Sequence, residues 1–338
     1  MPDTAPQDRF PLRSTIILTA AGFLAIVLPL LLMNLGVLDT YTMLIITMGG
    51  VNAIMAVSVN TVVGITGQLS LGQAGFLAIG AYGCIFFNLD AGLPLPLAIV
   101  CAVLITGIAG FLIGFPVLKL SGDYLAIVTL GFGEIIRVVF INLKAITGGP
   151  NGRMFTTIVK LNSSLAFGVV TLFLVVIVAL LQNFLRSTYG RAIMACREDE
   201  IAANSCGINI FRYKMLGFVI AALIAGIGGC LYAMVVGLVQ PANAQFLRSI
   251  DYLIFVVFGG MGSMTGSILA AYVLTYLQEI LRFLQDYRLL IYPLILILVM
   301  IFRPKGLLGT KEFSFVRAWD LFVNFVKGKN RKAGGGTA

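Results

Sequence analysis

The sequence contains no histidine, and only 11% of its 338 residues are charged. A chain without histidine lacks the commonest metal ligand and the commonest general base. Soluble domains carry about 25% charged residues, so the composition argues against a soluble protein as well. The chain is instead rich in apolar residues: 59% of it is hydrophobic and the mean hydropathy is +1.01. We therefore expect an all-α integral membrane protein.

Two further motifs are missing. The five cysteines form no C-x-x-C pair, and no G-x-x-x-x-G-K-[ST] sequence occurs. The first absence argues against a disulfide or a metal site, so no metal and no cofactor are predicted. The second excludes a P-loop. If the protein works with ATP, another chain must bind and hydrolyse it.

Long apolar runs recur along the chain, each near the length of about 20 residues that crosses a bilayer core. The first run could belong to a signal peptide, but it is long for one and no cleavage motif follows it. We expect eight to ten membrane helices between residues 15 and 303, after an N-terminus at 1–14 and before a tail at 304–338 whose end is disordered. The ten candidate spans are 15–33, 41–63, 67–87, 93–117, 124–143, 165–184, 214–236, 250–262, 264–284 and 288–302.

The net charge of +9 is unevenly placed. With ten spans, sixteen of the 23 lysine and arginine residues fall on one side, in the two termini, a short turn and the loop 185–214. Because positive loops stay in the cytoplasm, both termini and that loop are expected there. The positive charge is then a loop bias and does not indicate nucleic-acid binding.

Glycine is concentrated in two stretches, GITGQLSLGQAGFLAIGAYG at 64–83 and GGMGSMTGSILAAY at 259–272. Glycine weakens helices, and non-helical backbone at membrane depth occurs where protein or a water-filled cavity satisfies it. Paired glycine-interrupted segments point to the path of a transporter. The residues expected along this path are Gly67, Gln68, Ser70, Gly72, Gln73, Gly75, Gly259, Gly260, Gly262 and Gly266.

Charges within the spans are few. Glu134 and Arg137 lie three residues apart inside the span 124–143, so they fall on one helix face and can pair. Ionisable residues inside a membrane often mark function, but such a pair can also be structural, and both interpretations stay open.

The loop 185–214 is longer than a plain connector. Its centre, EDEIAANSCGI, predicts a short helix that ends at Gly207 and has acidic residues in its first turn, where the helix dipole favours them. Small residues give this helix a surface that another protein could contact.

Six blocks carry a resemblance: GQLSLGQAGFLAIGAY, TLGFGEIIR, TGGPNG, REDEIAANSCGINIFRYKMLGFVIAALIAGIGGCLYA, VFGGMGSMTGS and FRPKGLLG. Together they resemble the permeases of branched-chain amino acid ABC importers, and more narrowly their M-type subunits. The urea-type permeases share much of this pattern. The resemblance implies a bacterial inner-membrane location beside lipid, a second homologous permease, two ATP-binding subunits and a periplasmic solute-binding protein.

The resemblance also implies roles for particular segments. The stretch Glu200–Ala203 with Gly207 is similar to the E-A-A loop, although Ile201 interrupts the E-A-A order. By that similarity, residues 197–209 would form a coupling helix on an ATPase. The loops 144–163 and 237–249 would receive the binding protein, and Gly148–Gly152 would form a rigid turn there. The residues expected to contact the ATPase are Glu198, Glu200, Ala202, Ala203 and Gly207.

Other functions remain possible from the sequence. A secondary transporter or channel would explain the glycine breaks but not the coupling-like loop. An intramembrane enzyme lacks histidine and any convincing nucleophile–base set. The substrate itself stays open among leucine-type amino acids, other amino acids, urea, amides and aromatic acids.

Overall fold

The computed structural model describes residues 39–287, except 121 and 157–161, together with a few isolated positions after 287. The predicted spans 15–33 and 288–302 and both terminal segments lie outside these residues, apart from those isolated positions.

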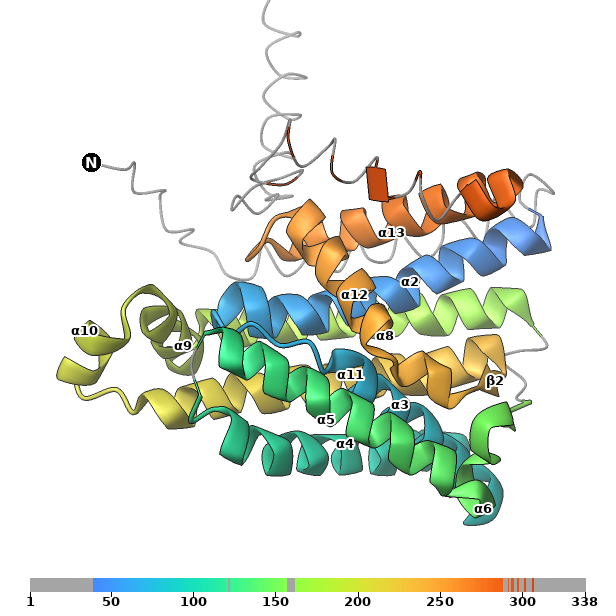
Figure 1. Cartoon of the computed structure of the whole chain (residues 1–338), viewed down its shortest axis with the longest axis horizontal. Coiled ribbons are helices and arrows are strands. Elements are labelled where there is room, and N and C mark those ends of the chain that lie inside the picture. The colour runs from blue at the N-terminus through green and yellow to red at the C-terminus, as the bar shows by residue number, and fades with distance from the viewer. Residues whose placement is uncertain are drawn as a thin grey trace, which may run out of the picture.

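Six described helices are long and apolar enough to cross a membrane. They are α2 (Thr40–Asn60, continued by a π-helical turn, Thr61–Ile65), α4 (Leu95–Val117), α5 (Asp123–Asn142), α8 (Ser163–Arg186), α11 (Ile210–Val236) and α13 (Met264–Ile280). They lie side by side in one bundle (Figure 1). Asn162, Asn209 and Ser263 precede three of them and accept hydrogen bonds from amides of the first turn, as N-cap residues do.

Two shorter helices differ from the predicted spans. The segment expected to be helical over 67–87 forms a helix only from Gln73, as α3 (Gln73–Ile85), which a π-helical turn extends to Asp90. The span expected at 250–262 is α12 (Phe246–Gly259), so it begins four residues earlier. Helix α3 begins among buried residues, whereas the first three residues of α12 are exposed and lie beside the middle of α5. The four-residue spacing of Ser70, Ala74 and Ala78 predicts one helix face, but Ser70 lies before α3 in non-helical backbone.

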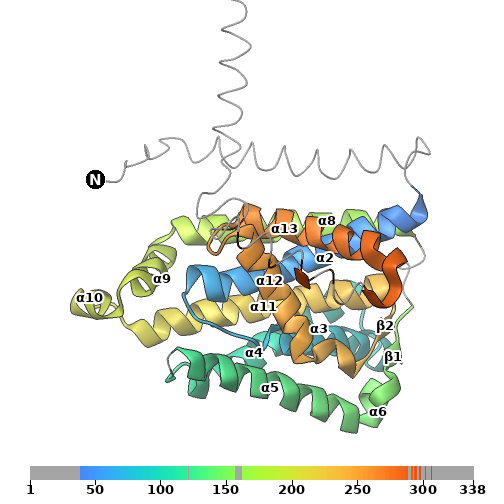
Figure 2. The same ribbon diagram turned by 45° about the horizontal axis from the view of Figure 1, so that its top comes forward.

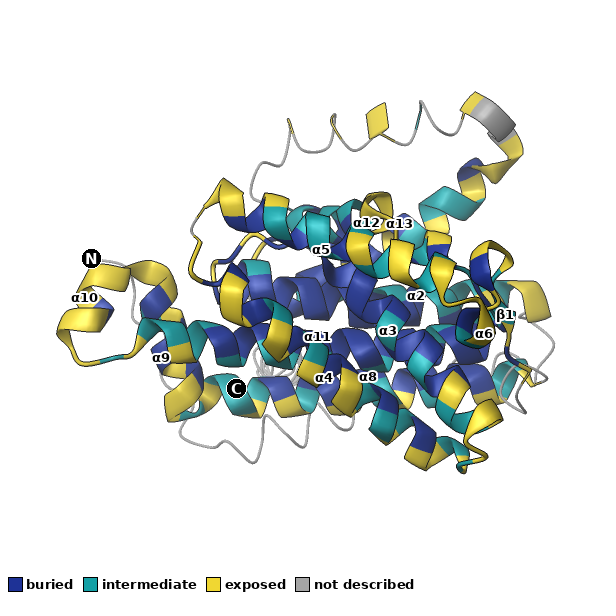
Figure 3. Ribbon diagram, turned by 60° about the horizontal axis from the view of Figure 1, so that its bottom comes forward, coloured by how far each residue is buried: buried dark blue, intermediate teal, exposed yellow. Residues whose placement is uncertain are grey.

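Helix α11 lies at the centre of the bundle, where buried residues gather (Figure 3). Its small residues make this possible, because they let neighbouring backbones approach closely. A Cβ added to Gly229 would lie 2.0 Å from the Leu77 carbonyl oxygen of α3, and one added to Gly80 would lie 2.3 Å from the Gly226 carbonyl oxygen. Small residues every four positions in the sequence predict such a packing face, and these contacts confirm it: Gly217, Ala221, Ala225, Gly229 and Ala233.

The helices around α11 alternate in direction. The end of α2 reaches the start of α11, since Thr66 packs against Gly217. The start of α2 reaches the end of α13, where Tyr41 donates a hydrogen bond to Glu279. Helix α2 therefore runs opposite to both α11 and α13.

The connecting segments gather at the two ends of the bundle (Figure 2). At one end, α9 (Thr188–Glu198) and α10 (Glu200–Ser205) project beyond the membrane helices. At the other end lie α6 (Lys144–Thr147) and a two-stranded antiparallel pair, β1 (Arg153–Met154) with β2 (Leu238–Val239). The loop expected at 237–249 is shorter than predicted, because its last four residues are the first turn of α12.

Candidate functional site

The first glycine stretch contains a break in the helices. After the π-helical turn, Gly67 has a φ of +71°, which glycine adopts most readily, and the chain stays non-helical until Gln73. Neighbouring helices supply partners for its backbone. Leu71 N–H donates to Thr129 Oγ1 of α5 at 3.0 Å, and Ala74 N–H donates to Ser249 Oγ of α12 at 3.0 Å. The prediction of an interrupted helix in this stretch is confirmed.

The glycines of this stretch permit close packing against α5. A Cβ at Gly72 would lie 2.6 Å from the Thr129 carbonyl oxygen, and a Cβ at Gly75 would lie 3.2 Å from the Gly133 Cα. Gly72 therefore excludes a larger side chain, Gly75 leaves little room for one, and the break is held against the middle of α5.

A buried polar cluster surrounds the break. Ser58, Asn60, Gln68, Ser70 and Gln73 are all at most 4% exposed. The Ser58 hydroxyl lies 2.7 Å from the Ala221 carbonyl oxygen and 3.1 Å from Gln73 Oε1. Ser58 and Asn60 were missed from the sequence, where the only signal was a pair of polar residues within an apolar run.

Several polar atoms of this cluster have no hydrogen-bond partner among the described residues. They are Asn60 Nδ2, Gln68 Nε2 and Oε1, Ser70 Oγ and Gln73 Nε2. An unsatisfied buried polar group costs about 1–3 kcal/mol. The cluster is therefore a place where water or a polar solute would be stabilised if the helices moved apart.

The second glycine stretch meets the first. Gly262 N–H donates to Asn60 Oδ1 at 2.9 Å, and a Cβ at Gly64 would lie 2.4 Å from the Gly262 nitrogen. Gly260 and Gly262 have φ values of 110° and 88°. Gly259 and Gly266 pack against each other at the corner between α12 and α13. The sequence identified both stretches but did not predict this contact.

The predicted pair on α5 forms. Arg137 Nε lies 2.6 Å from Glu134 Oε2, and the two side chains are 27% and 28% exposed. The structure adds a third partner, because Phe246 N–H, at the start of α12, donates to Glu134 Oε1 at 3.2 Å. Glu134 thus joins the middle of α5 to the first turn of α12.

Residues 188–205, named the coupling segment after the role expected of residues 197–209, form two helices, so the expectation of one helix over 197–209 is wrong. The chain turns at Asp199, whose carboxylate accepts hydrogen bonds from Ile201 and Ala202 N–H and caps α10. Glu198 ends α9 and its side chain is 77% exposed. The short helix itself and the turn at Gly207, with φ of +80°, are confirmed.

The small residues of α10 do not share one surface. Ala202 is exposed and Ala203 is buried. Glu200 forms an ion pair with Lys214 of α11, with Nζ and Oε1 at 2.5 Å, so its carboxylate is engaged within the chain. The apolar side chain that α10 presents most openly is Ile201, which is 81% exposed.

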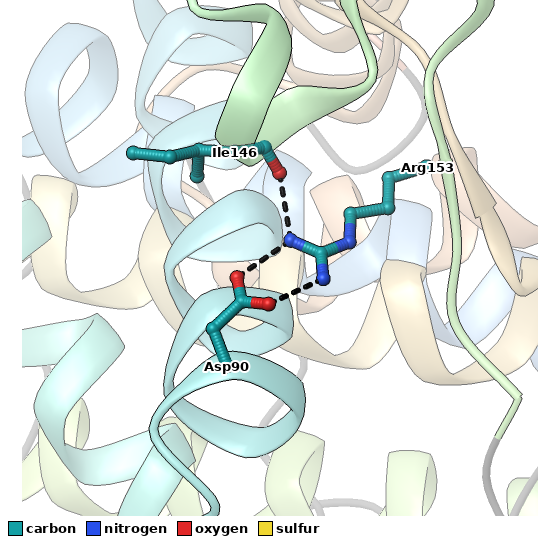
Figure 4. Close-up of polar contacts among 3 residues, drawn as sticks. All are labelled: Asp90, Ile146 and Arg153. Carbon is teal, nitrogen blue, oxygen red and sulfur yellow. Dashed lines mark hydrogen bonds and ion pairs between the residues drawn. The ribbon is translucent and has the colours of Figure 1, made fainter.

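At the opposite end of the bundle, the predicted rigid turn forms. Gly148, Gly149 and Gly152 all have positive φ. Next to it, Arg153 holds the Asp90 carboxylate with two nitrogens, at 2.6 and 2.5 Å, and donates to the Ile146 carbonyl oxygen (Figure 4). The hydrogen bonds from Arg153 lower the pKa of Asp90. Nothing in the sequence indicates this pair, because Asp90 ends the π-helical turn after α3 and Arg153 lies in β1.

The family described as "Branched-chain amino acid transport system / permease component" matches residues 41–301. The chain belongs to this family. The predicted resemblance is confirmed, and the permease is a membrane transport component rather than an enzyme.

Two similar proteins are each named "High-affinity branched-chain amino acid transport system permease protein LivM". The one from Salmonella typhimurium is 42% identical over 293 residues, covering 78% of this chain and 69% of the relative. The one from Escherichia coli is 38% identical over 330 residues, covering 89% and 76%. The E. coli permease protein LivH is 32% identical over 132 residues, covering 38% and 42%. No solved structure matches the chain.

Proposed function

We propose that the permease is the M-type subunit of an ABC importer that carries branched-chain amino acids across the bacterial inner membrane. The observation that carries this proposal is the similarity to two proteins named LivM over most of the chain. A permease for urea, amides or another small polar solute is the alternative within the same family.

The importer requires partners. We infer a second homologous permease, because LivH, a permease protein named separately from LivM, is also similar to part of this chain. Two ATP-binding subunits would supply the energy, and a periplasmic solute-binding protein would deliver the substrate to the end that carries the Gly148–Gly152 turn. The projecting α10, with Ile201 exposed, supports docking of an ATP-binding subunit at the cytoplasmic end.

The proposed topology has ten spans with both termini in the cytoplasm, and a membrane domain from 15 to 303 between the terminal segments 1–14 and 304–338. Opposed directions of α2 and α11 support an internal repeat of inverted orientation. The repeat would pair α2 with α11 and α3 with α12. Each repeat then contains a long helix followed by a short one, α2 and α3 in the first and α11 and α12 in the second.

Transport would proceed by alternating access along the two glycine breaks. Their unpartnered polar atoms support this, because amides and hydroxyls without partners in the described state can be satisfied by water or solute when the breaks part. The close contact between Gly64 and Gly262 then belongs to a closed state of the path.

Glu134 and Arg137 are partly exposed on the outer face of α5. Exposure of an ion pair to lipid is costly. We propose that this face is covered by the second permease or lines the water-filled path beside it, and that the pair also fixes the start of α12.

The test begins with purification of the tagged chain from its native host in mild detergent and identification of co-purifying proteins by mass spectrometry. A second permease and ATP-binding subunits are expected. The complex is then reconstituted in vesicles with its binding protein, and ATP-driven uptake of leucine and of urea is compared. A lone, stable chain would refute the importer, and uptake of urea without leucine would favour the alternative substrate.

A further inference from the structure

Arg197, in the last turn of α9, reaches from the coupling segment to the first glycine break. Its Nη1 donates to the Gly64 carbonyl oxygen at 2.5 Å. Gly64 lies at the end of the long helix formed by α2 and its π-helical turn. Carbonyl groups at a helix end lack partners within the helix, and the dipole there favours a cation. Arg197 is therefore well placed to hold this helix end.

The same guanidinium borders the second break. A Cβ at Gly262 would lie 3.2 Å from Arg197 Nη1, and Gly262 is bonded through its N–H to Asn60. The stem of Arg197 packs on Gly67, where a Cβ would lie 3.0 Å from Arg197 Cγ. Arg197 thus contacts both breaks at the point where they meet.

A second arginine of the same helix, Arg191, makes different hydrogen bonds. Arg191 donates to the Arg186 carbonyl oxygen and to Thr188 Oγ1, both next to or within the coupling segment. Its side chain is exposed and forms no contact with Gly64 or Gly262 among the described hydrogen bonds. Arg191 therefore provides a matched control.

We propose that Arg197 is a positioning residue that transmits movement of the coupling segment to the two glycine breaks. The inference rests on the proposed function, in which an ATP-binding subunit moves α9 and α10. In the described state, the guanidinium holds Gly64 beside Gly262. When α9 shifts, it withdraws from the Gly64 carbonyl oxygen, and the two breaks are free to separate.

The first experiment uses the complete importer in vesicles, with its binding protein, and compares R197Q, R197K and R191Q. R197Q is expected to lower ATP-driven leucine uptake at least tenfold while ATP hydrolysis stays within twofold of the unchanged complex. Lysine in R197K keeps the positive charge and can donate a hydrogen bond, but it lacks the planar guanidinium group. Intermediate uptake is therefore expected. R191Q is expected to behave like the unchanged complex.

A second readout separates transmission from simple support of the fold. A cysteine replacing Thr66, in a background without the five native cysteines, is labelled with a water-soluble maleimide with and without a non-hydrolysable ATP analogue. Thr66 is 2% exposed in the described state. Nucleotide is expected to change the labelling rate with Arg197 in place, and the R197Q change should abolish that response and R197K reduce it.

Uptake by R197Q equal to that by R191Q in an assembled complex would overturn the inference, as would an undiminished nucleotide response. If the R197Q complex does not assemble, the R197K complex provides the test: a nucleotide response in Thr66 labelling that R197K does not reduce would overturn the inference. An unchanged complex that assembles but moves no leucine with ATP would overturn the proposed function itself, and this inference with it.

Discussion

The contact between α3 and α11 gives a sharp prediction for Gly229→Ala. The added Cβ would lie 2.0 Å from the Leu77 carbonyl oxygen and 2.9 Å from the Ala81 nitrogen, whereas ordinary contacts begin near 3.4 Å. Because both neighbours are backbone atoms of a packed helix, neither can rotate away. The two helices must separate locally, and overpacking of this kind costs about 1–3 kcal/mol.

Gly168→Ala in α8 is the matched control, because a Cβ there would meet nothing within 4 Å. The same substitution in a helix otherwise improves helix propensity by about 1 kcal/mol. The two variants should therefore shift stability in opposite directions.

The assay heats the purified complex and measures, by size-exclusion chromatography, the temperature at which half of it is lost. Gly229→Ala should lower that temperature by several degrees, and Gly168→Ala should leave it unchanged or raise it. Equal temperatures for the two variants would refute the close packing of α11 against α3.

Three further predictions follow from the breaks and the two ends of the bundle. Gly72→Val should abolish uptake yet leave the complex assembled on a gel-filtration column, because its side chain would collide with the Thr129 carbonyl oxygen; normal uptake would contradict this. Asp199→Ala removes the cap of α10, which is typically worth about 1 kcal/mol, and should weaken binding of the ATP-binding subunits in a pull-down; unchanged binding would argue against docking through α10. Hydrogen bonds from Arg153 depress the native pKa of Asp90. The stabilisation of the folded protein by this pair is therefore complete above the unfolded-state pKa of about 3.9. It is lost as the pH falls through the lower native pKa. Asp90→Asn should therefore melt earlier than the unchanged protein at pH 6, and the difference should shrink below about pH 4; a difference that persists in acid would count against this pair.

The sequence was informative wherever a local pattern determines structure. Apolar length predicted the long helices, and glycine placement predicted the interruption before Gln73 and the turn at Gly207. The small residues of α11 predicted its packing face. Each of these features depends on residues close together in the chain.

Features that depend on distant residues could not be predicted. Nothing in the sequence relates Arg197 to Gly64, or Asp90 to Arg153, because these pairs form only after the bundle is assembled. The start of α12 was misplaced for a related reason. Polar Arg248 looks like a loop residue, but in the structure it lies in a helix whose first amide is bonded to Glu134.

Helix α3 begins among buried residues, and α12 begins beside it, since Ser249 Oγ in the first turn of α12 accepts a hydrogen bond from the first turn of α3. The amino-terminal end of a helix carries a partial positive charge. The Glu134 carboxylate offsets the end of α12, whereas the end of α3 is met by the neutral Ser249 hydroxyl. Positive ends of half-helices in other membrane proteins exclude protons and cations. The arrangement would let a solute without net charge pass while resisting a leak of protons or sodium ions. A cell could then keep many copies of this permease in its membrane without dissipating the voltage that drives its other energy-requiring processes.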